Sequence, residues 1–218
     1  MYSKMKHLLI LGARGFGREI YNSALESIGY GTEFDIKGYL DEKANALDGF
    51  DGYPQIIGPV ETYEIQEDDV FVCALGDVKY KTKYAQMILD KGGEFITLIH
   101  KSAYISRNVK IGKGCLILAD SRIHCDVTIG NYVTIQPKAV IGHDVVVEDW
   151  CMINAFADCG GAAYMEEGAT LHTHSFLLPK KRIGAYAVLG ACSLAARNVK
   201  PGTVVIGVPA KELLLPKM

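Results

Sequence analysis

A six-residue repeat fills the C-terminal half of the chain and constrains the fold more than any other feature. From Ile99 onward, an aliphatic or otherwise apolar residue returns at every sixth position. These lead residues are Ile105, Ile111, Ile117, Ile123, Ile129, Ile135, Ile141, Val147, Ile153, Cys159, Met165, Leu171, Leu177, Ile183 and Leu189. A period of six matches neither a helix nor a single strand. It indicates a repeat architecture.

A solenoid explains the other regularities of the repeat. The fifth position of almost every unit is small or β-branched, and glycine often follows the lead residue. Each unit would form one short strand and a corner, and three units would close a triangular coil of eighteen residues. Small residues would fit the narrow interior, and strands about 4.8 Å apart would build a prism roughly 25 Å tall. We therefore expect an all-β parallel β-helix over residues 99–218.

The N-terminal half has a different pattern, in which strands and helices alternate. The strands and helices expected there are, in chain order, 7–11, 18–28, 36–40, 70–75 and 79–89. Such alternation predicts a small parallel sheet with crossover helices. We expect an α/β, Rossmann-like half-domain over residues 1–98, too short for a complete dinucleotide-binding fold.

Composition excludes several classes of partner. A formal charge of -2 and a pI near 6.3 give no general attraction to nucleic acid or anionic lipid. The N-terminal apolar run is too short for a secretory or membrane segment. Six cysteines without a C-x-x-C pair favour packed, reduced thiols over a disulfide or zinc framework. These features favour a cytoplasmic protein that binds neither nucleic acid nor membrane.

Several motifs together resemble one enzyme family. The hexads follow the pattern [LIV]-G-x4, and the chain closes with Asn198–Thr203 and Gly207–Lys211. The N-terminal half contributes GARGFG, YLDE, ALGD and LIHKSAYIS. With these motifs the whole chain resembles the sialic-acid and bacillosamine type of sugar acetyltransferase. The resemblance implies a left-handed β-helix, acetyl-CoA as co-substrate, and a homotrimer with active sites between adjacent prisms.

His143 is the strongest catalytic candidate among six histidines. Acyl transfer from a thioester needs a base near neutral pKa and a donor for the developing oxyanion. One coil of eighteen residues beyond His143 lies Gly161, whose backbone N–H would be open to a ligand. The resemblance assigns the same roles, with His143 as base, Asp144 as its acidic partner and Gly161 as oxyanion donor. As strand neighbours, His143 and Asp144 should point apart, so their contact requires a bend.

The resemblance also implies a cofactor path and leaves one metal alternative. Coenzyme A should lie along an edge of the prism, past Gly161, Thr173 and Ala191, with Gly207–Lys211 near the adenine. Met152 stands where close relatives have a cofactor-contacting histidine. The pair His172 and His174 could suggest a metal, as in γ-class carbonic anhydrase, but the ligand spacing of that enzyme is absent. We expect no metal.

The glycines of the first strand-to-helix turn suggest an anion site. The pattern Gly12-x-x-Gly15-x-Gly17 could hold a phosphate at the helix N-terminus or could only permit tight packing. A dinucleotide oxidoreductase with Asp41 as ribose ligand is a further reading, which the short domain disfavours. By resemblance, a nucleotide sugar contacts the following positions: Arg14, Gly15, Phe16, Asp41, Glu42 and Gly76. Phe16 replaces a histidine common in the family.

These observations lead to one expected function and one alternative. We expect an acetyl-CoA-dependent N- or O-acetyltransferase that acts on a nucleotide-linked amino sugar or sialic acid in surface-glycan precursor synthesis, with His143 as general base. The alternative is a non-catalytic scaffold of the same fold that binds nucleotide sugar and CoA. The replacements at Phe16 and Met152 motivate that alternative.

Overall fold

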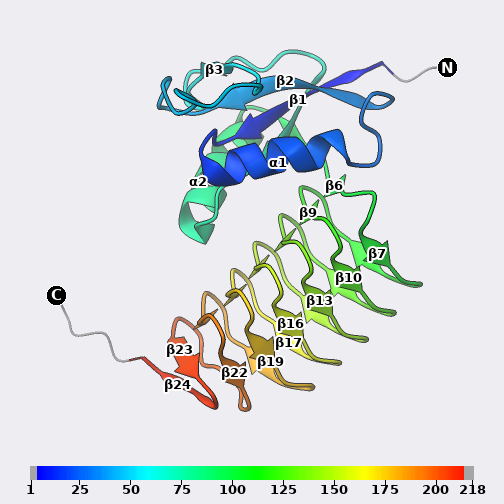
Figure 1. The fold of residues 1–218 in the computed structure, drawn as a ribbon, viewed down its shortest axis with the longest axis vertical. Helices are drawn as coiled ribbons and strands as arrows, with labels where there is room; N and C mark the ends of the chain where they lie inside the picture. The colour runs from blue at the N-terminus through cyan, green and yellow to red at the C-terminus, as the bar shows by residue number, and fades with distance from the viewer. Residues whose placement is uncertain (1–3, 214–218) are drawn as a thin grey trace. The chain divides into compact units, whose positions relative to one another are not determined.

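The computed structural model describes residues 4–213 and divides the chain into two compact units (Figure 1). The first unit is Met1–Lys101 and the second is Ser102–Met218. The sequence pattern predicted the domain boundary between residues 98 and 99. No helix among the described residues has the length and apolar character needed to cross a membrane.

The N-terminal unit is a five-stranded, all-parallel sheet in the order β3-β2-β1-β4-β5. Its elements are β1 (Lys6–Leu11), α1 (Gly15–Leu25), β2 (Phe34–Leu40), β3 (Ile56–Gly58), β4 (Asp69–Cys73), α2 (Val78–Asp90) and β5 (Glu94–Phe95). The central strands are apolar and buried over Leu8–Leu11 of β1 and Val70–Cys73 of β4, as expected for a parallel sheet covered on both faces. The predicted Rossmann-like half-domain is confirmed.

The structure corrects the predicted elements of this unit in two places. Helix α1 begins at Gly15, three residues before the predicted start at Arg18, because the glycine turn is itself the first helical turn. It ends at Leu25, before the glycine expected to close it at position 29. Strands β3 and β5 were not predicted, since three and two residues carry no readable period.

The C-terminal unit is a three-sided parallel β-helix. One face holds β7 (Tyr104–Ile105), β10 (Arg122–Ile123), β13 (Val140–Ile141), β16 (Asp158–Cys159), β19 (Phe176–Leu177) and β22 (Leu194–Ala195). The second holds β8 (Lys110–Ile111), β11 (Thr128–Ile129), β14 (Val146–Val147), β17 (Tyr164–Met165) and β20 (Arg182–Ile183). The third holds β6 (Leu98–Ile99), β9 (Leu116–Ile117), β12 (Thr134–Ile135), β15 (Met152–Ile153), β18 (Thr170–Leu171), β21 (Val188–Leu189) and β23 (Val204–Gly207), with β24 (Ala210–Glu212) antiparallel to β23.

The strand register matches the expected coil. Ile123 pairs with Ile141, and Ile141 with Cys159, so each lead residue lies beside the one eighteen positions later. From Ile117 to Leu189 the lead residues are all buried. Figure 1 shows the coils stacked one above another from β9 to β23. The hexapeptide pattern is therefore the core of a parallel β-helix, as the sequence predicted, and this architecture matches the left-handed β-helix that the resemblance implied.

The corners of the β-helix form three edges with a common backbone conformation. In every repeat from Asn108 to Cys192, the fourth residue has positive φ. Edge A is formed by Asn108, Asp126, Asp144, Ala162 and Lys180; edge B by Gly114, Tyr132, Trp150, Gly168 and Tyr186; edge C by Asp120, Lys138, Phe156, His174 and Cys192. Left-handed backbone costs about 1–2 kcal/mol in a residue with a side chain. Hydrogen bonds between coils offset that cost, as where Asp144 N–H donates to the Cys125 carbonyl at 3.1 Å.

Candidate active site

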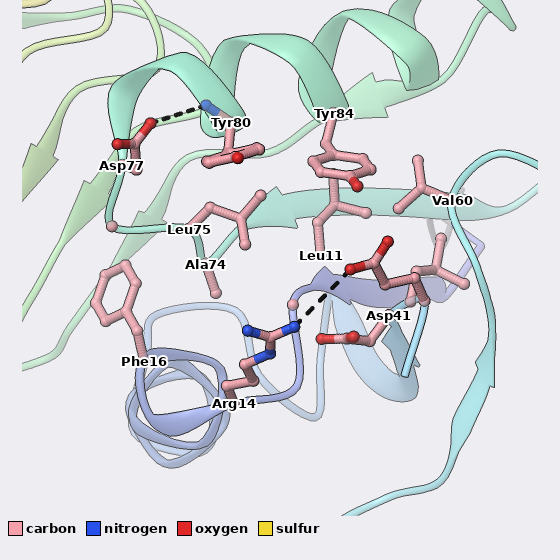
Figure 2. Close-up of a pocket in the computed structure, with 14 residues that line it drawn as sticks. Leu11, Arg14, Phe16, Asp41, Val60, Ala74, Leu75, Asp77, Tyr80 and Tyr84 are labelled. Carbon is pink, nitrogen blue, oxygen red and sulfur yellow. Dashed lines mark hydrogen bonds and ion pairs between the residues drawn. The ribbon is translucent and has the colours of Figure 1, made fainter. Parts of the chain in front are cut away.

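A pocket of about 440 Å³ opens at the carboxyl ends of β1, β2 and β4 in the N-terminal unit. The pocket is lined by Leu11, Gly12, Arg14, Phe16, Leu40, Asp41, Glu42, Val60, Ala74, Leu75, Gly76, Asp77, Tyr80 and Tyr84. Figure 2 shows Arg14 and Phe16 on one side, opposite Tyr80 and Tyr84 of α2. Five of the six predicted sugar-nucleotide positions meet here, and only Gly15 is not part of the lining.

Asp41 fixes the shape of the pocket at the end of β2. Its Oδ2 accepts the Ala13 N–H at 2.9 Å, and its Oδ1 accepts the Lys43 N–H at 2.9 Å. Both carboxylate oxygens therefore tie down backbone. Glu42 is less constrained, since its carboxylate lies 3.9 Å from the Arg14 guanidinium. Arg14 and Glu42 can thus turn toward a ligand.

The three glycines of the first turn serve different purposes. A Cβ on Gly17 would lie 2.0 Å from the Gly12 carbonyl oxygen, so that position requires glycine for packing. Gly12 has a φ of +95° and lies against Ala74 and Leu75. A Cβ on Gly15 would meet nothing within 4 Å. Packing therefore explains Gly12 and Gly17, and only Gly15 lies at an open helix N-terminus, where Arg14 makes no side-chain cap.

Sequence reasoning missed the aromatic side of the pocket. Tyr80 and Tyr84 are one helical turn apart on α2 and line the pocket with Val60. Burial, followed by the nearby carboxylates of Glu61, Glu42 and Asp41, raises the pKa of Tyr84, so its hydroxyl stays protonated as a donor. The sequence signal that could have predicted this side of the pocket is the pair of tyrosines four residues apart in the helix that follows Gly76.

In the β-helix unit, His143 and Asp144 form a hydrogen-bonded pair on edge A. His143 Nδ1 lies 2.7 Å from Asp144 Oδ2. A carboxylate only accepts, so Nδ1 carries the proton and Nε2 of the neutral ring is the free, basic nitrogen. The bend that this contact requires is the corner itself, because Asp144 has a φ of +58°.

Two glycines make room around the imidazole. A Cβ on Gly161 would lie 2.6 Å from His143 Nε2, and a Cβ on Gly142 would lie 2.6 Å from the Gly161 backbone nitrogen. Among the described residues no hydrogen bond uses the Gly161 N–H. The geometry thus places a basic nitrogen beside an open backbone donor. Gly142 is a functional position that the sequence analysis did not single out.

The three edges differ in how their backbone N–H groups are satisfied. On edge B, side-chain oxygens accept hydrogen bonds from these backbone N–H groups. The pairs, with the donor first, are Lys113 to Asn131, Asn131 to Asp149, Glu167 to Glu148, and Ala185 to Glu166. On edge A, in the part of the chain that the structure describes, the N–H groups of His143 and Gly161 donate to no protein group, and on edge C the same holds for Thr173 and Ala191. Edges A and C therefore have donors for a ligand.

The predicted cofactor residues do not lie along one edge of a single chain. Thr173 and Ala191 are on consecutive coils of edge C, where Cys192 N–H donates to the Thr173 carbonyl at 3.0 Å. Gly161 lies on edge A. Met152 lies on β15, between edges B and C, and is only 1% exposed. Within one chain, Gly161 and Thr173 lie on different edges because they are twelve residues, two corners, apart.

The two histidines considered as metal ligands have structural partners. His172 Nδ1 lies 3.0 Å from the Asn154 side-chain nitrogen, while His174 stacks on Phe156 at 4.7 Å. These two imidazoles point to different neighbours and do not converge on one ion. No cluster of three potential metal ligands occurs among residues 4–213. The six cysteines are free, and only Cys192 is exposed.

Comparison with known proteins identifies both units. Residues 7–88 match the family model of the PglD N-terminal domain, and residues 126–157 match that of bacterial transferase hexapeptide repeats. The N-terminal unit is therefore similar to PglD N-terminal domains, and the C-terminal unit is similar to hexapeptide-repeat transferases. More particularly, the chain is similar to bacillosamine and perosamine N-acetyltransferases, which confirms the resemblance seen in the sequence.

Individual relatives support this placement at moderate identity. The chain is 30% identical over 119 residues to UDP-N-acetylbacillosamine N-acetyltransferase of Bacillus subtilis, covering 53% of this chain and 52% of that protein. It is 26% identical over 148 residues to GDP-perosamine N-acetyltransferase of Escherichia coli O157:H7, covering 66% and 67%. The chain thus spans about half the length of the first relative, and 24% of protein L142 of Acanthamoeba polyphaga mimivirus.

A solved structure extends the likeness to nearly the whole chain. PerB from Caulobacter crescentus, crystallised with CoA and GDP-perosamine, superposes with a TM-score of 0.84 at 26% identity, covering 95% of this chain and 97% of PerB. CoA and a nucleotide sugar are therefore ligands of a protein with both of these units.

Proposed function

We propose that the protein transfers the acetyl group of acetyl-CoA to the amine of a nucleotide-linked amino sugar. The observation that carries the proposal is the His143–Asp144 hydrogen bond beside the open Gly161 N–H. The relatives named above act on bacillosamine and perosamine, both amino sugars, which favours the amine over a hydroxyl as nucleophile. The pathway is surface-glycan precursor synthesis.

In the reaction, His143 acts as the general base and Gly161 stabilises the oxyanion. His143 Nε2 takes the proton of the amine as its nitrogen attacks the thioester carbonyl carbon, while Asp144 stabilises the imidazolium through Nδ1. The Gly161 N–H donates to the oxyanion. Collapse forms the amide C–N bond and breaks the C–S bond, and the proton on His143 passes to the CoA sulfur. No metal takes part in these steps.

The N-terminal pocket would hold the nucleotide part of the substrate. Arg14 and the uncapped N-terminus of α1 at Gly15 suit a diphosphate, and Phe16, Asp41, Glu42 and Gly76 line the adjoining space. Phe16 supplies an apolar ring where the family commonly has a histidine. That substitution removes a hydrogen-bonding group from the pocket but leaves its charges in place.

A homotrimer would explain why the cofactor positions are split between edges. Gly161 lies on edge A, whereas Thr173 and Ala191 lie on edge C, and both edges flank the face that carries β13. If that face turns toward a threefold axis, edge A of one chain meets edge C of the next. CoA would then lie between chains, with its thioester at Gly161 and its pantetheine along Thr173 and Ala191 of the neighbour. The free thiols and the nature of the substrates fit a cytoplasmic enzyme.

An acceptor screen tests the proposal. The protein is incubated with acetyl-CoA and with UDP- or GDP-linked 4-amino sugars, GDP-perosamine among them, and CoA thiol release is followed together with the mass of the acetylated product. Turnover that His143→Ala abolishes supports the proposal. The same turnover in His143→Ala would refute the base assignment. Binding of CoA and nucleotide sugar without turnover would instead support the non-catalytic scaffold.

A further inference from the structure

Phe156 is an aromatic residue held in place on edge C. Its φ of +60° is uncommon for a bulky side chain, and its side chain is well exposed, at 47%. One face of the ring stacks on His174 at 4.7 Å with the planes only 12° apart, and Lys138 Nζ lies 5.4 Å from its centroid. The ring is thus fixed by its own edge while it remains open to a ligand or partner.

The level of Phe156 along the prism is set by the repeat. One coil takes eighteen residues and rises about 4.8 Å, so position in the chain gives height along the axis. Phe156 follows His143 and precedes Gly161, and its height therefore falls between the two. A threefold axis parallel to the prism preserves height from copy to copy. In the proposed trimer, on which this inference rests, the partner's Phe156 would lie on the facing edge at a height between His143 and Gly161.

The direction of the thioester decides what the ring meets. Under the proposed function, the thioester carbonyl would lie at the Gly161 N–H and the pantetheine arm would run past Thr173 and Ala191, which are at greater heights than Gly161. The acyl carbons extend from the carbonyl in the opposite sense, toward the lower level of Phe156. We propose that Phe156 of one copy closes the acyl end of its neighbour's active site and restricts the transferred group to acetyl.

Acyl selectivity gives a direct test. The ratio kcat/KM for butyryl-CoA over acetyl-CoA is measured for the wild type and for Phe156→Ala, with propionyl-CoA as the intermediate length. Two methylenes that meet a fixed ring should be disfavoured, and one methylene is worth about 10–200-fold. Phe156→Ala should raise the ratio at least tenfold. An unchanged ratio in an active variant overturns the proposal.

A matched control lies on edge B. Tyr186 has nearly the same backbone conformation, with a φ of 55°, and similar exposure, at 52%, but it belongs to the edge whose donors are already used. Tyr186→Ala should leave the ratio unchanged. Alanine fits the corner, since Ala162 has a φ of 56°. A ratio within one variant also does not depend on the fraction of protein that is folded.

Mixed assemblies test whether Phe156 acts on the neighbouring chain. Chains carrying Phe156→Ala are mixed and refolded with increasing amounts of His143→Ala chains, which keep Phe156. Only the former chains supply a base, so if Phe156 acts across the boundary, the butyryl-to-acetyl ratio should fall toward the wild-type value as the mixture changes. A constant ratio would show that the ring acts within its own chain or not at all.

A binding measurement separates this inference from the proposed reaction. Dissociation constants of acetyl-CoA and butyryl-CoA are measured by calorimetry without acceptor, so that no acceptor needs to be known. In Phe156→Ala, the affinity for butyryl-CoA relative to acetyl-CoA should rise compared with the wild type. If the wild type binds both acyl-CoAs but Phe156→Ala does not change their relative affinities, only the inference about Phe156 is overturned. If the wild type binds no acyl-CoA, the proposed function is overturned as well.

Discussion

His143 Nδ1 and Asp144 Oδ2 lie 2.7 Å apart although the two residues are neighbours in the chain. In an extended strand their side chains would point to opposite faces. The left-handed corner at Asp144, with a φ of +58°, turns both to the same side. The hexapeptide corner thus does two things at once, because it closes the coil and it orients the base.

Asp144→Asn should impair catalysis while leaving the fold intact. An amide can place its N–H group toward Nδ1, which would favour the tautomer that carries the proton on Nε2 and so remove the base. The pair is exposed, so we expect a loss in kcat of about tenfold to a hundredfold, smaller than for a buried triad. Steady-state rates from pH 6 to 9 check this. Wild-type kcat over that range would show that Asp144 does not support the base.

Gly161→Ala should abolish most of the activity through a steric effect. The new Cβ would meet His143 Nε2 at 2.6 Å and push the imidazole away from the acceptor. Misplacement of a catalytic group by about 1 Å can cost about a hundredfold. Gly58→Ala is the control, since a Cβ there meets nothing within 4 Å. Equal kcat in the two variants would contradict the arrangement of His143 and Gly161.

The glycines at the first turn should separate stability from ligand binding. Gly17→Ala must move the Gly12 carbonyl, 2.0 Å from the new Cβ, and should lower the free energy of unfolding of the N-terminal unit by about 2–4 kcal/mol. Gly15→Ala meets no neighbour and should leave that free energy unchanged. Urea unfolding followed by tyrosine fluorescence measures both. A similar loss at Gly15 would mean that this glycine also has a packing role.

The repeat was readable from sequence because its signal is local and periodic. Each lead residue such as Ile141 faces the interior, and the coil length fixes which residues stack, so the proximity of His143 and Gly161 follows from counting eighteen. In the N-terminal unit, the strands with long apolar runs were readable for a similar reason. The two-residue strand β5 was not, because it forms only where β4 offers a partner.

Other features depended on side-chain positions that counting does not give. The role of Gly142 comes from the approach of the Gly161 nitrogen, and the division between Gly12, Gly15 and Gly17 comes from what a Cβ would meet. By contrast, the placement of Gly161 and Thr173 on different edges does follow from counting, since twelve residues are two of the three sides of a coil.

Lys37, Tyr63 and Asp69 predict an acid-sensitive N-terminal unit. The Asp69 carboxylate, whose side chain is fully buried, accepts from Lys37 Nζ at 2.6 Å, from the Tyr63 hydroxyl at 2.7 Å and from the Gln66 N–H at 2.8 Å. Burial alone would raise the pKa of Asp69, but Lys37 and the other donors outweigh it and hold that pKa below its ordinary value. The folded state therefore gains stability from this carboxylate above the unfolded pKa of about 3.9, and loses it as the pH falls toward the lower folded pKa.

Asp69→Asn should accordingly destabilise the unit most at neutral pH. We expect the free energy of unfolding to fall by about 2–3 kcal/mol at pH 7. The loss is limited because Lys37 is partly exposed, so water can solvate its ammonium group when the partner is neutral. Below pH 4 the difference from wild type should shrink, since the unfolded wild-type carboxylate binds a proton there while the folded one stays ionised until the pH reaches its lower pKa. Thermal unfolding from pH 3 to 7 checks this, with Asp90→Asn as a control, because Asp90 is exposed and its carboxylate accepts a hydrogen bond from the exposed Gln86 side chain. A difference between Asp69→Asn and wild type that is constant over this range would show that the charge on Asp69 does not contribute to stability.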